Sequence, residues 1–215
     1  RCSRDWSSDV CSSDLEGVAL AEVKNHLSEC GAAVNAHGIE FDPERAWHAK
    51  GMLDVVAHAD VNDVFVTARS MGLLFLNPPY GDTVADKAGT GDNAKRERLE
   101  KIFYRKTVPS LQFGGILVLI VPYYVMDAEF SGMIARHFER VTIHMAPEKQ
   151  FKQCVVMGIK RRADTADAGV MKRLESVGKG ELPPELPDGW CEEAYLVPAA
   201  TPEDGFAFTA RRLDG

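Results

Sequence analysis

The sequence has no apolar run approaching the roughly 18 residues that a membrane-spanning helix needs. Its longest apolar stretch, residues 116–121, has the length of one strand. The 5 cysteines form no Cys-x-x-Cys pair and no Cys/His cluster, and the 6 histidines lack metal-ligand spacing. These absences argue against a disulfide framework and a metal site, so we expect a reduced, cytoplasmic protein with no metal and no membrane contact.

An excess of positive charge is also missing. The net charge is −7, with 18 Lys and Arg against 18 Asp and Glu in residues 16–162, and 5 against 11 in residues 163–215. Net charge therefore does not indicate a strongly basic nucleic-acid-binding protein, and any such role must come from local patches.

Both ends of the chain differ from its middle. Residues 1–15 contain Ser-Ser-Asp twice and show no apolar periodicity. This leader resembles translated sequencing-adapter DNA, so we exclude it from the fold; a native polar arm is the alternative. Residues 163–215 are expected to form a linker, with a Pro- and Gly-containing turn at 182–189, followed by the start of a further module. Short strand-like runs at 194–197 and 205–210 belong to that module.

The middle of the chain, residues 16–162, alternates between strand-like and helix-like segments. Strands are predicted at residues 35–41, 55–59, 71–76, 116–121, 140–145 and 153–160. Helices are predicted at residues 18–30, from the Asp42-Pro43 cap onward, and at 95–111 and 127–138, with a loop at 81–93. This order predicts an α/β fold with a doubly wound, mostly parallel sheet and an antiparallel closing pair.

A stiff polar corner, Asn77-Pro78-Pro79-Tyr80, follows the apolar segment 71–76. The two prolines fix two φ angles and remove two backbone donors, which leaves nearby carbonyl oxygens available to a ligand. Asn77 offers both a donor and an acceptor, and Tyr80 offers a flat ring. Because ligands bind beyond the carboxyl ends of parallel strands, this corner is the strongest candidate site.

Two acids, Glu40 and Asp60, follow the two earlier predicted strands in the same way. Each is also the kind of residue that commonly caps a helix or forms a turn.

The corner lies in MGLLFLNPPY, residues 71–80, which resembles the catalytic motif of class I S-adenosylmethionine-dependent amino-methyltransferases. The resemblance extends to GIEFDPERA at 38–46 and LQFGGILV at 111–118, and it covers residues 16–162. With FKQCVVMGIKR at 151–161, the motifs are most similar to the methyltransferase-like DUF6094 family. The resemblance implies a Rossmann-like fold that binds S-adenosylmethionine.

Four residues match cofactor-binding positions of that family. By the resemblance, Glu40 would accept hydrogen bonds from the ribose hydroxyls, Phe41 would pack on the adenine, and Asp60 would accept from its amino group. Gly17 would end the Gly-rich turn that holds the methionine part. The rest of that turn and the first strand are missing, because the leader occupies their place. Since that strand lies mid-sheet in the family, we expect the 215-residue chain to bind S-adenosylmethionine weakly.

The corner itself matches the family's target-binding positions. By the resemblance, Asn77 and the carbonyl of Pro78 would accept hydrogen bonds from the target amino group, while Pro79 keeps the corner stiff. Tyr80 would stack on the target. Proximity and orientation would supply most of the rate, so the mechanism requires no general base with a shifted pKa.

A predicted helix carries the most concentrated positive charge. Its cations are Lys95, Arg96, Arg98, Lys101, Arg105 and Lys106. They could contact DNA phosphates while loop 81–93 closes over a flipped base; a solvated helix face with ion pairs is the alternative. Residues 160–162 form a second, smaller basic cluster that could instead be a solvated strand end.

These observations leave several functions open. The first hypothesis is methylation of the amino group of adenine in DNA. The second keeps S-adenosylmethionine and changes the substrate to RNA guanine or protein glutamine. The third is an inactive remnant, or a nucleic-acid-binding module without activity on the same fold.

Overall fold

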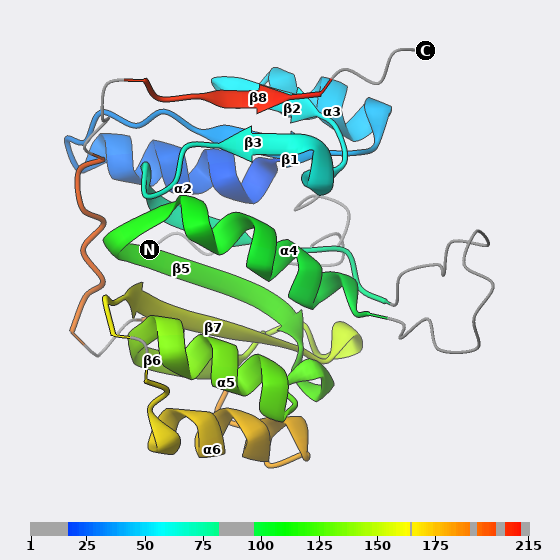
Figure 1. The fold of residues 1–215 in the computed structure, drawn as a ribbon, viewed down its shortest axis with the longest axis vertical. Helices are drawn as coiled ribbons and strands as arrows, with labels where there is room; N and C mark the ends of the chain where they lie inside the picture. The colour runs from blue at the N-terminus through cyan, green and yellow to red at the C-terminus, as the bar shows by residue number, and fades with distance from the viewer. Residues whose placement is uncertain (1–16, 82–96, 164, 190–192, 201–204, 212–215) are drawn as a thin grey trace. The chain divides into compact units, whose positions relative to one another are not determined.

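The computed structural model describes residues 17–81, 97–163, 165–189, 193–200 and 205–211. The leader at 1–15, most of the predicted loop at 81–93, and Lys95 and Arg96 lie outside these ranges. The chain forms two compact units (Figure 1). Unit 1 comprises residues up to Thr67 together with those from Gly205 onward, and unit 2 comprises Ala68–Asp204.

The described residues of unit 1 form two small sheets and two helices. The strands β1 (His37–Glu40) and β2 (Val55–His58) pair in parallel, and β3 (Val64–Val66) pairs with β8 (Phe208–Ala210) antiparallel. The helices are α2 (Val18–Glu29) and α3 (Pro43–Lys50), and the 3-10 turn η2 spans Val61–Asp63. Its core is small and centres on Ala36, Ala49 and Leu53.

The predicted start of α3 is confirmed. Asp42 is the N-cap, and its side chain accepts hydrogen bonds from the backbone N–H groups of Glu44 and Arg45 at 3.0 Å each. Pro43 occupies the first turn, where its missing N–H has no helical partner to lose. This cap fixes the point at which the chain leaves β1, immediately after Glu40.

Unit 2 is built on one mixed sheet with the strand order β4-β5-β7-β6. The strands are β4 (Met71–Leu76), β5 (Leu111–Pro122), β6 (Phe138–Met145) and β7 (Gln153–Lys160). β4 runs parallel to β5, and the β5–β7 and β6–β7 pairs are antiparallel. The predicted α/β fold with an antiparallel closing pair is therefore confirmed, but the sheet of unit 2 is mixed rather than mostly parallel, because only its β4–β5 pairing is parallel.

The helices in the described part of unit 2 are α4 (Leu99–Thr107), α5 (Ala128–His137) and α6 (Ala168–Gly178). Short 3-10 turns are η3 (Val108–Ser110), η4 (Tyr123–Val125) and η5 (Lys149–Phe151). Helices α5 and α6 lie side by side (Figure 1). The core includes Tyr104, Leu117, Phe130, Phe138 and Leu174, all fully buried.

The strand β4 is less covered than its apolar sequence predicts. Only Leu76 is buried, and the other residues of the strand are half-buried. Within the described ranges β4 pairs with β5 alone, and the β1–β2 pair forms a separate sheet.

Two predicted segments have different bounds in the structure. The helix predicted over 95–111 ends at Thr107, because Pro109 follows in η3 and Leu111 already belongs to β5. The strand predicted over 116–121 begins at Leu111. An irregularity in the β4–β5 register between Met71 and Leu73 accommodates Gly114, whose φ is +80°.

The C-terminal segment contributes to both units. The run 205–210 yields β8 in unit 1, but the strand predicted at 194–197 is wrong, since residues 193–200 form no strand. They lie instead on unit 2, where the carbonyl of Ala199 accepts a hydrogen bond from Gln112 at 3.0 Å. A Cβ at Gly72 would come within 2.5 Å of the Pro198 carbonyl, so this close approach requires glycine.

Helix α6 was not predicted from the sequence. Asp167 caps it by accepting from the N–H groups of Gly169 and Val170, and Leu174 and Val177 enter the core. The apolar face of α6 is short, so polar residues dominate the composition of this segment and mask its helical pattern.

We expect Leu174→Ala to lower the free energy of unfolding of unit 2 by roughly 2–5 kcal/mol. Leu174 is 0% exposed, so the truncation leaves a cavity between α6 and the core. Urea unfolding measures the change, and Lys172→Ala on the exposed face of α6 is the control, expected within roughly 0.5 kcal/mol of the original chain. Equal stabilities for both variants would show that α6 does not support unit 2.

No helix in the described part of the chain combines the length and the apolar character needed to cross a membrane.

Candidate functional site

The Asn77–Tyr80 corner lies at the carboxyl end of β4. Because β4 runs parallel to β5, with Leu76 opposite Leu119, this is the edge at which β5 ends in Pro122. Pro78 is buried and Pro79 is exposed, while Asn77 and Tyr80 are half-buried. The corner therefore has an anchored side and an accessible side.

A hydrogen-bonded relay orients the corner. The Oη of Tyr80 donates to Oδ1 of Asn77 at 2.9 Å, and Nε2 of Gln153 donates to the same Tyr80 oxygen. Gln153 is 4% exposed and pairs with Pro122 across the β5–β7 ladder. Since an amide N–H can only donate, the tyrosine oxygen accepts from Gln153 and its own proton is directed to Asn77.

Sequence reasoning missed Gln153, because it is 73 residues from Tyr80 and the β5–β7 pairing brings them together. The sequence predicts only a stacking role for the ring of Tyr80. In the structure, the hydroxyl of Tyr80 also holds the Asn77 side chain.

A second aromatic residue lies at the same edge. Tyr124, in η4 directly after β5, is 51% exposed, and the guanidinium carbon of Arg98 lies 5.5 Å from its ring centroid. The backbone ties Arg98 to the corner as well, since the N–H of Leu99 donates to the carbonyl of Gly81 at 2.9 Å. A flat ring with a cation above it is a suitable surface for stacking. Its only sequence signal is its position after a buried strand.

The cations predicted along α4 are balanced by carboxylates. Arg98 pairs with the fully buried Glu100 at 2.8 Å, and Lys101 pairs with Asp127 and Glu129 at 2.6 Å each. Arg105 pairs with Glu97 and, at 3.1 Å, with Glu129. Three of the predicted phosphate contacts therefore lie in an ion-pair network. Two of its four carboxylates, Glu97 and Glu100, are close to the cations in sequence, and the other two, Asp127 and Glu129, come from another segment.

The network shifts the pKa values of two members. Burial lowers the pKa of Lys101, but hydrogen bonds to Asp127 and Glu129 raise it more, so the net direction is upward. The hydrogen bond from Lys101, followed by that from Arg105, holds the pKa of Glu129 below its usual range. Both groups therefore remain charged at neutral pH.

The predicted cofactor residues of unit 1 share one edge. Glu40 ends β1 and lies opposite His58, which ends β2. The N–H of Ala59 donates to the Glu40 carbonyl at 3.1 Å, so Asp60 follows at the same edge. Phe41 is 63% exposed. The parallel pairing of β1 and β2 thus brings Glu40, Phe41 and Asp60 together.

Gly17 occupies a different place in unit 1. It is the N-cap of α2 with φ +84°, a left-handed conformation that favours glycine. A Cβ there would lie 3.2 Å from Leu53 and 3.3 Å from Ala49, so Gly17 packs against the C-terminal end of α3. The structure gives Gly17 a packing role within unit 1.

The hydrogen-bond acceptors at the Glu40 edge fit the hydroxyl groups of a ribose. Oε1 of Glu40 accepts from the N–H of Asp42 at 2.7 Å and from Arg45 at 3.1 Å, whereas Oε2 has no partner among the described residues. Asp60 likewise uses one oxygen, Oδ1, to accept from Asn62. Each carboxylate therefore keeps an acceptor for a ligand while its partners hold it in position.

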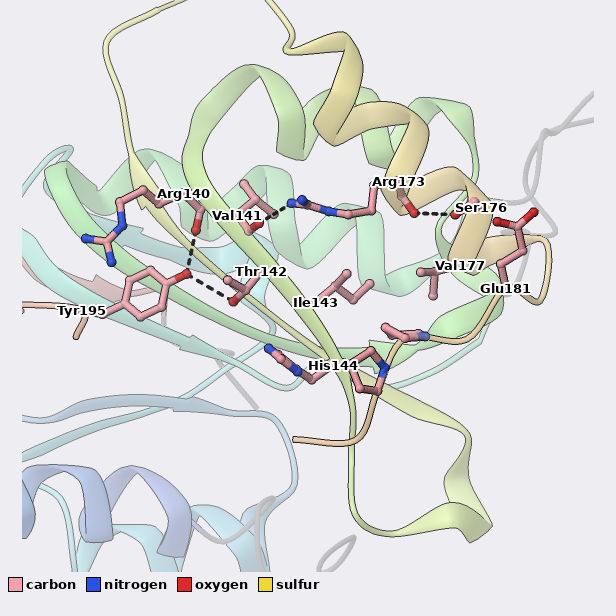
Figure 2. A pocket seen from close by; sticks show the side chains of 12 residues that line it. Arg140, Val141, Thr142, Ile143, His144, Arg173, Ser176, Val177, Glu181 and Tyr195 are labelled. Carbon is pink, nitrogen blue, oxygen red and sulfur yellow. Dashed lines mark hydrogen bonds between the residues drawn. The ribbon is translucent and has the colours of Figure 1, made fainter. Parts of the chain in front are cut away.

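Two cavities can be described, and no predicted site residue lines either. The larger, of about 550 Å³, lies between β6 and α6 in unit 2 (Figure 2). Tyr195 donates to the Arg140 carbonyl at 2.6 Å, and Arg173 donates to the Val141 carbonyl, so much of its polar lining is engaged internally. The smaller, of about 520 Å³, lies beside the end of α3.

No group of three His, Cys, Asp or Glu side chains within the described ranges is placed to hold a metal ion.

Comparisons with known proteins agree on the fold. The model of the "Uncharacterised methyltransferase family (DUF6094)" matches residues 17–189. A structure from Listeria monocytogenes, described as a class I S-adenosylmethionine-dependent methyltransferase, superposes with a TM-score of 0.55 at 15% identity. That match covers 76% of this chain and 62% of the Listeria chain, so the chain spans less than two thirds of that relative.

A structure from Agrobacterium tumefaciens described as an O-methyltransferase gives a TM-score of 0.46 at 19% identity, covering 76% of this chain and 85% of its own. A search of curated proteins gives no match. The Listeria superposition confirms the Rossmann-like methyltransferase fold predicted from the motifs.

Proposed function

We propose that the chain, which belongs to the uncharacterised methyltransferase family DUF6094, transfers a methyl group from S-adenosylmethionine to the nitrogen of a planar amino group. Adenine in DNA is the first candidate substrate. The observation that carries the proposal is the corner at the end of β4, where Gln153 and Tyr80 hold Asn77 in a defined orientation. Methyl transfer to nitrogen needs such fixed acceptors because orientation supplies most of its rate.

Three residues of unit 1 would hold the cofactor. Glu40 accepts from the ribose hydroxyls through Oε2, Phe41 packs on the adenine, and Asp60 accepts from the adenine amino group. Gly17 would end the Gly-rich turn that holds the methionine part. When bound, S-adenosylmethionine supplies an electrophilic methyl group on a positively charged sulfur.

The corner residues would hold the target. Oδ1 of Asn77, which Tyr80 holds in place, would accept a hydrogen bond from the target amino group together with the carbonyl of Pro78. These two bonds hold the amino hydrogens in plane and direct the nitrogen lone pair out of it. Pro79 keeps the backbone extended. Tyr80 or the exposed Tyr124 would cover the face of the target.

The substrate class follows from what surrounds the corner. For DNA, Arg98 above Tyr124 offers a stacking surface, and Lys95, Arg96, Arg98, Lys101 and Arg105 offer phosphate contacts. The ion pairs of Arg98, Lys101 and Arg105 favour a second candidate, a glutamine side-chain amide in a protein, because they lower the net positive charge of α4.

Transfer of tritiated methyl groups tests the proposal. The chain is incubated at millimolar S-adenosylmethionine, since weak cofactor binding is expected, with plasmid DNA, RNA or protein as acceptor. Label in DNA supports adenine methylation, and label only in protein supports the glutamine amide. Absence of label from all acceptors, although the cofactor binds, would contradict the proposed activity and favour a nucleic-acid-binding or inactive protein.

We expect Gln153→Leu to lower kcat by roughly 2- to 10-fold, the effect of losing one hydrogen bond that fixes the Tyr80 proton. The KM for S-adenosylmethionine should stay the same, because Gln153 lies in unit 2, at the corner. Gln150→Ala, which removes an exposed glutamine from η5 just before β7, is the matched control. If kcat is unchanged in Gln153→Leu, the relay does not orient Asn77.

A further inference from the structure

Three cations surround the ring of Phe113 at the edge of the unit 2 sheet opposite Asn77. The distances from the ring centroid are 5.4 Å to the guanidinium carbon of Arg69, 5.7 Å to Nζ of Lys160 and 4.8 Å to the guanidinium carbon of Arg162. Arg69 precedes β4, Phe113 lies near the start of β5 and Lys160 ends β7. We call these four residues the Phe113 cluster.

The cluster has no carboxylate of its own. In the described part of the chain, none of its three cations forms an ion pair, whereas Arg98, Lys101 and Arg105 all do. The side chains of Arg69 and Arg162 are exposed, and they donate no hydrogen bond to a described residue. Their guanidinium groups therefore have their donor sites available to a ligand.

Lys160 is held more tightly than the two arginines. Its ammonium donates to the carbonyl of Val108 at 2.7 Å and to that of Leu111, which leaves one of its three donors. Burial and the repulsion of Arg69 lower its pKa to about 8. Holding these like charges together therefore destabilises the free protein, and an anion bound among them would relieve the repulsion.

The backbone holds Arg69 in this place. It is a non-glycine residue with φ +58°, and its N–H donates to the carbonyl of Pro109 at 3.0 Å. The next residue, Ser70, donates to the carbonyl of Ser110 at 2.8 Å. A left-handed conformation costs an arginine free energy, so the fold retains a locally unfavourable backbone that brings a cation to Phe113.

We propose that the Phe113 cluster binds the phosphate groups of a nucleic acid strand. Guanidinium groups bind phosphate oxygens in pairs, and the half-buried lysine adds a third positive charge. Charge complementarity favours this occupant. The cations of the cluster have no ion-pair partner among the described residues, whereas Arg98, Lys101 and Arg105 pair with carboxylates.

The site is separate from the proposed methyl-transfer corner. The six residues of β4 span about 20 Å between the cluster and Asn77. The cluster would therefore supply affinity without contacting the reacting group, and its role does not depend on catalysis. It gives a function to Lys160 and Arg162, two of the three basic residues at 160–162 that the sequence predicts as either a basic cluster or a solvated strand end.

Fluorescence anisotropy with labelled DNA, without S-adenosylmethionine, tests the inference. The double variant Arg69→Gln/Arg162→Gln is compared with Arg136→Gln/Lys172→Gln, which removes two exposed cations from α5 and α6 of the same unit. We expect the slope of log Kd against log salt concentration to fall by roughly two in the cluster variant, and to stay near the original value in the control. Thermal melting shows whether both variants fold.

Two results would overturn the inference. Equal slopes for the cluster variant and the control would mean that the cluster contacts no phosphate of DNA. Inorganic pyrophosphate serves as the small-anion probe: if the cluster variant loses pyrophosphate binding but keeps the original DNA slope, the site takes a free anion rather than a nucleic acid. Because the assay involves no turnover, its failure would leave the proposed methyl transfer untouched.

Discussion

Replacing Asn77 with alanine is expected to lower kcat for methyl transfer by about 100-fold or more. The variant removes the acceptor Oδ1, so the target amino group keeps only the carbonyl of Pro78 to hold it. The proton of Tyr80 loses its acceptor as well, since Tyr80 donates to Asn77 at 2.9 Å. Single-turnover measurements with excess chain separate this effect from product release.

Two further variants sharpen the test. Asn77→Asp keeps an acceptor oxygen in place and should retain more activity than Asn77→Ala. Asn35→Ala removes an exposed asparagine of unit 1 and should match the original chain. If Asn77→Ala keeps full activity with unchanged melting behaviour, the corner does not hold the target.

Replacing Glu40 with alanine is expected to weaken S-adenosylmethionine binding by about 10- to 100-fold. The ribose hydroxyls would lose a charged acceptor, and hydrogen bonds to charged groups contribute roughly 1.5–3 kcal/mol each. Equilibrium dialysis with labelled cofactor at millimolar concentration measures the change even when the original affinity is low. The kcat extrapolated to saturating cofactor should change much less than the Kd.

The controls for Glu40 address its structural contacts. Oε1 accepts from Asp42 and Arg45, so Glu40→Ala also loosens the start of α3. Glu44→Ala removes an exposed acid from the same turn and should leave cofactor binding unchanged. Glu40→Gln keeps an acceptor oxygen and should lie between the two. Equal affinities for all three variants would contradict the role of Glu40.

Local signals predicted much of the fold. The cap Asp42 lies where the sequence predicts it, and it accepts hydrogen bonds from backbone N–H groups of the first turn of α3. The apolar segment before Asn77 forms β4, as its strand-length run predicts. The cap of α3 and the run of β4 are both properties of a few consecutive residues, so the sequence alone contains their signals.

Long-range pairing accounts for what the sequence did not predict. Gln153 reaches Tyr80 only because β7 pairs with β5, and Lys101 finds its carboxylates on and just before α5. Phe113 gathers cations from segments before β4 and after β7. No periodicity reports such contacts, because they depend on strand order rather than on spacing along the chain.

Mass spectrometry of the methylated product tests the central claim most directly. The chain is incubated with DNA and S-adenosylmethionine carrying a deuterated methyl group, and the nucleosides are then separated. We predict the heavy methyl group on the exocyclic nitrogen of adenine, and its loss in the Asn77→Ala variant. A heavy methyl group on carbon or oxygen, or one that persists undiminished in Asn77→Ala, would contradict the account.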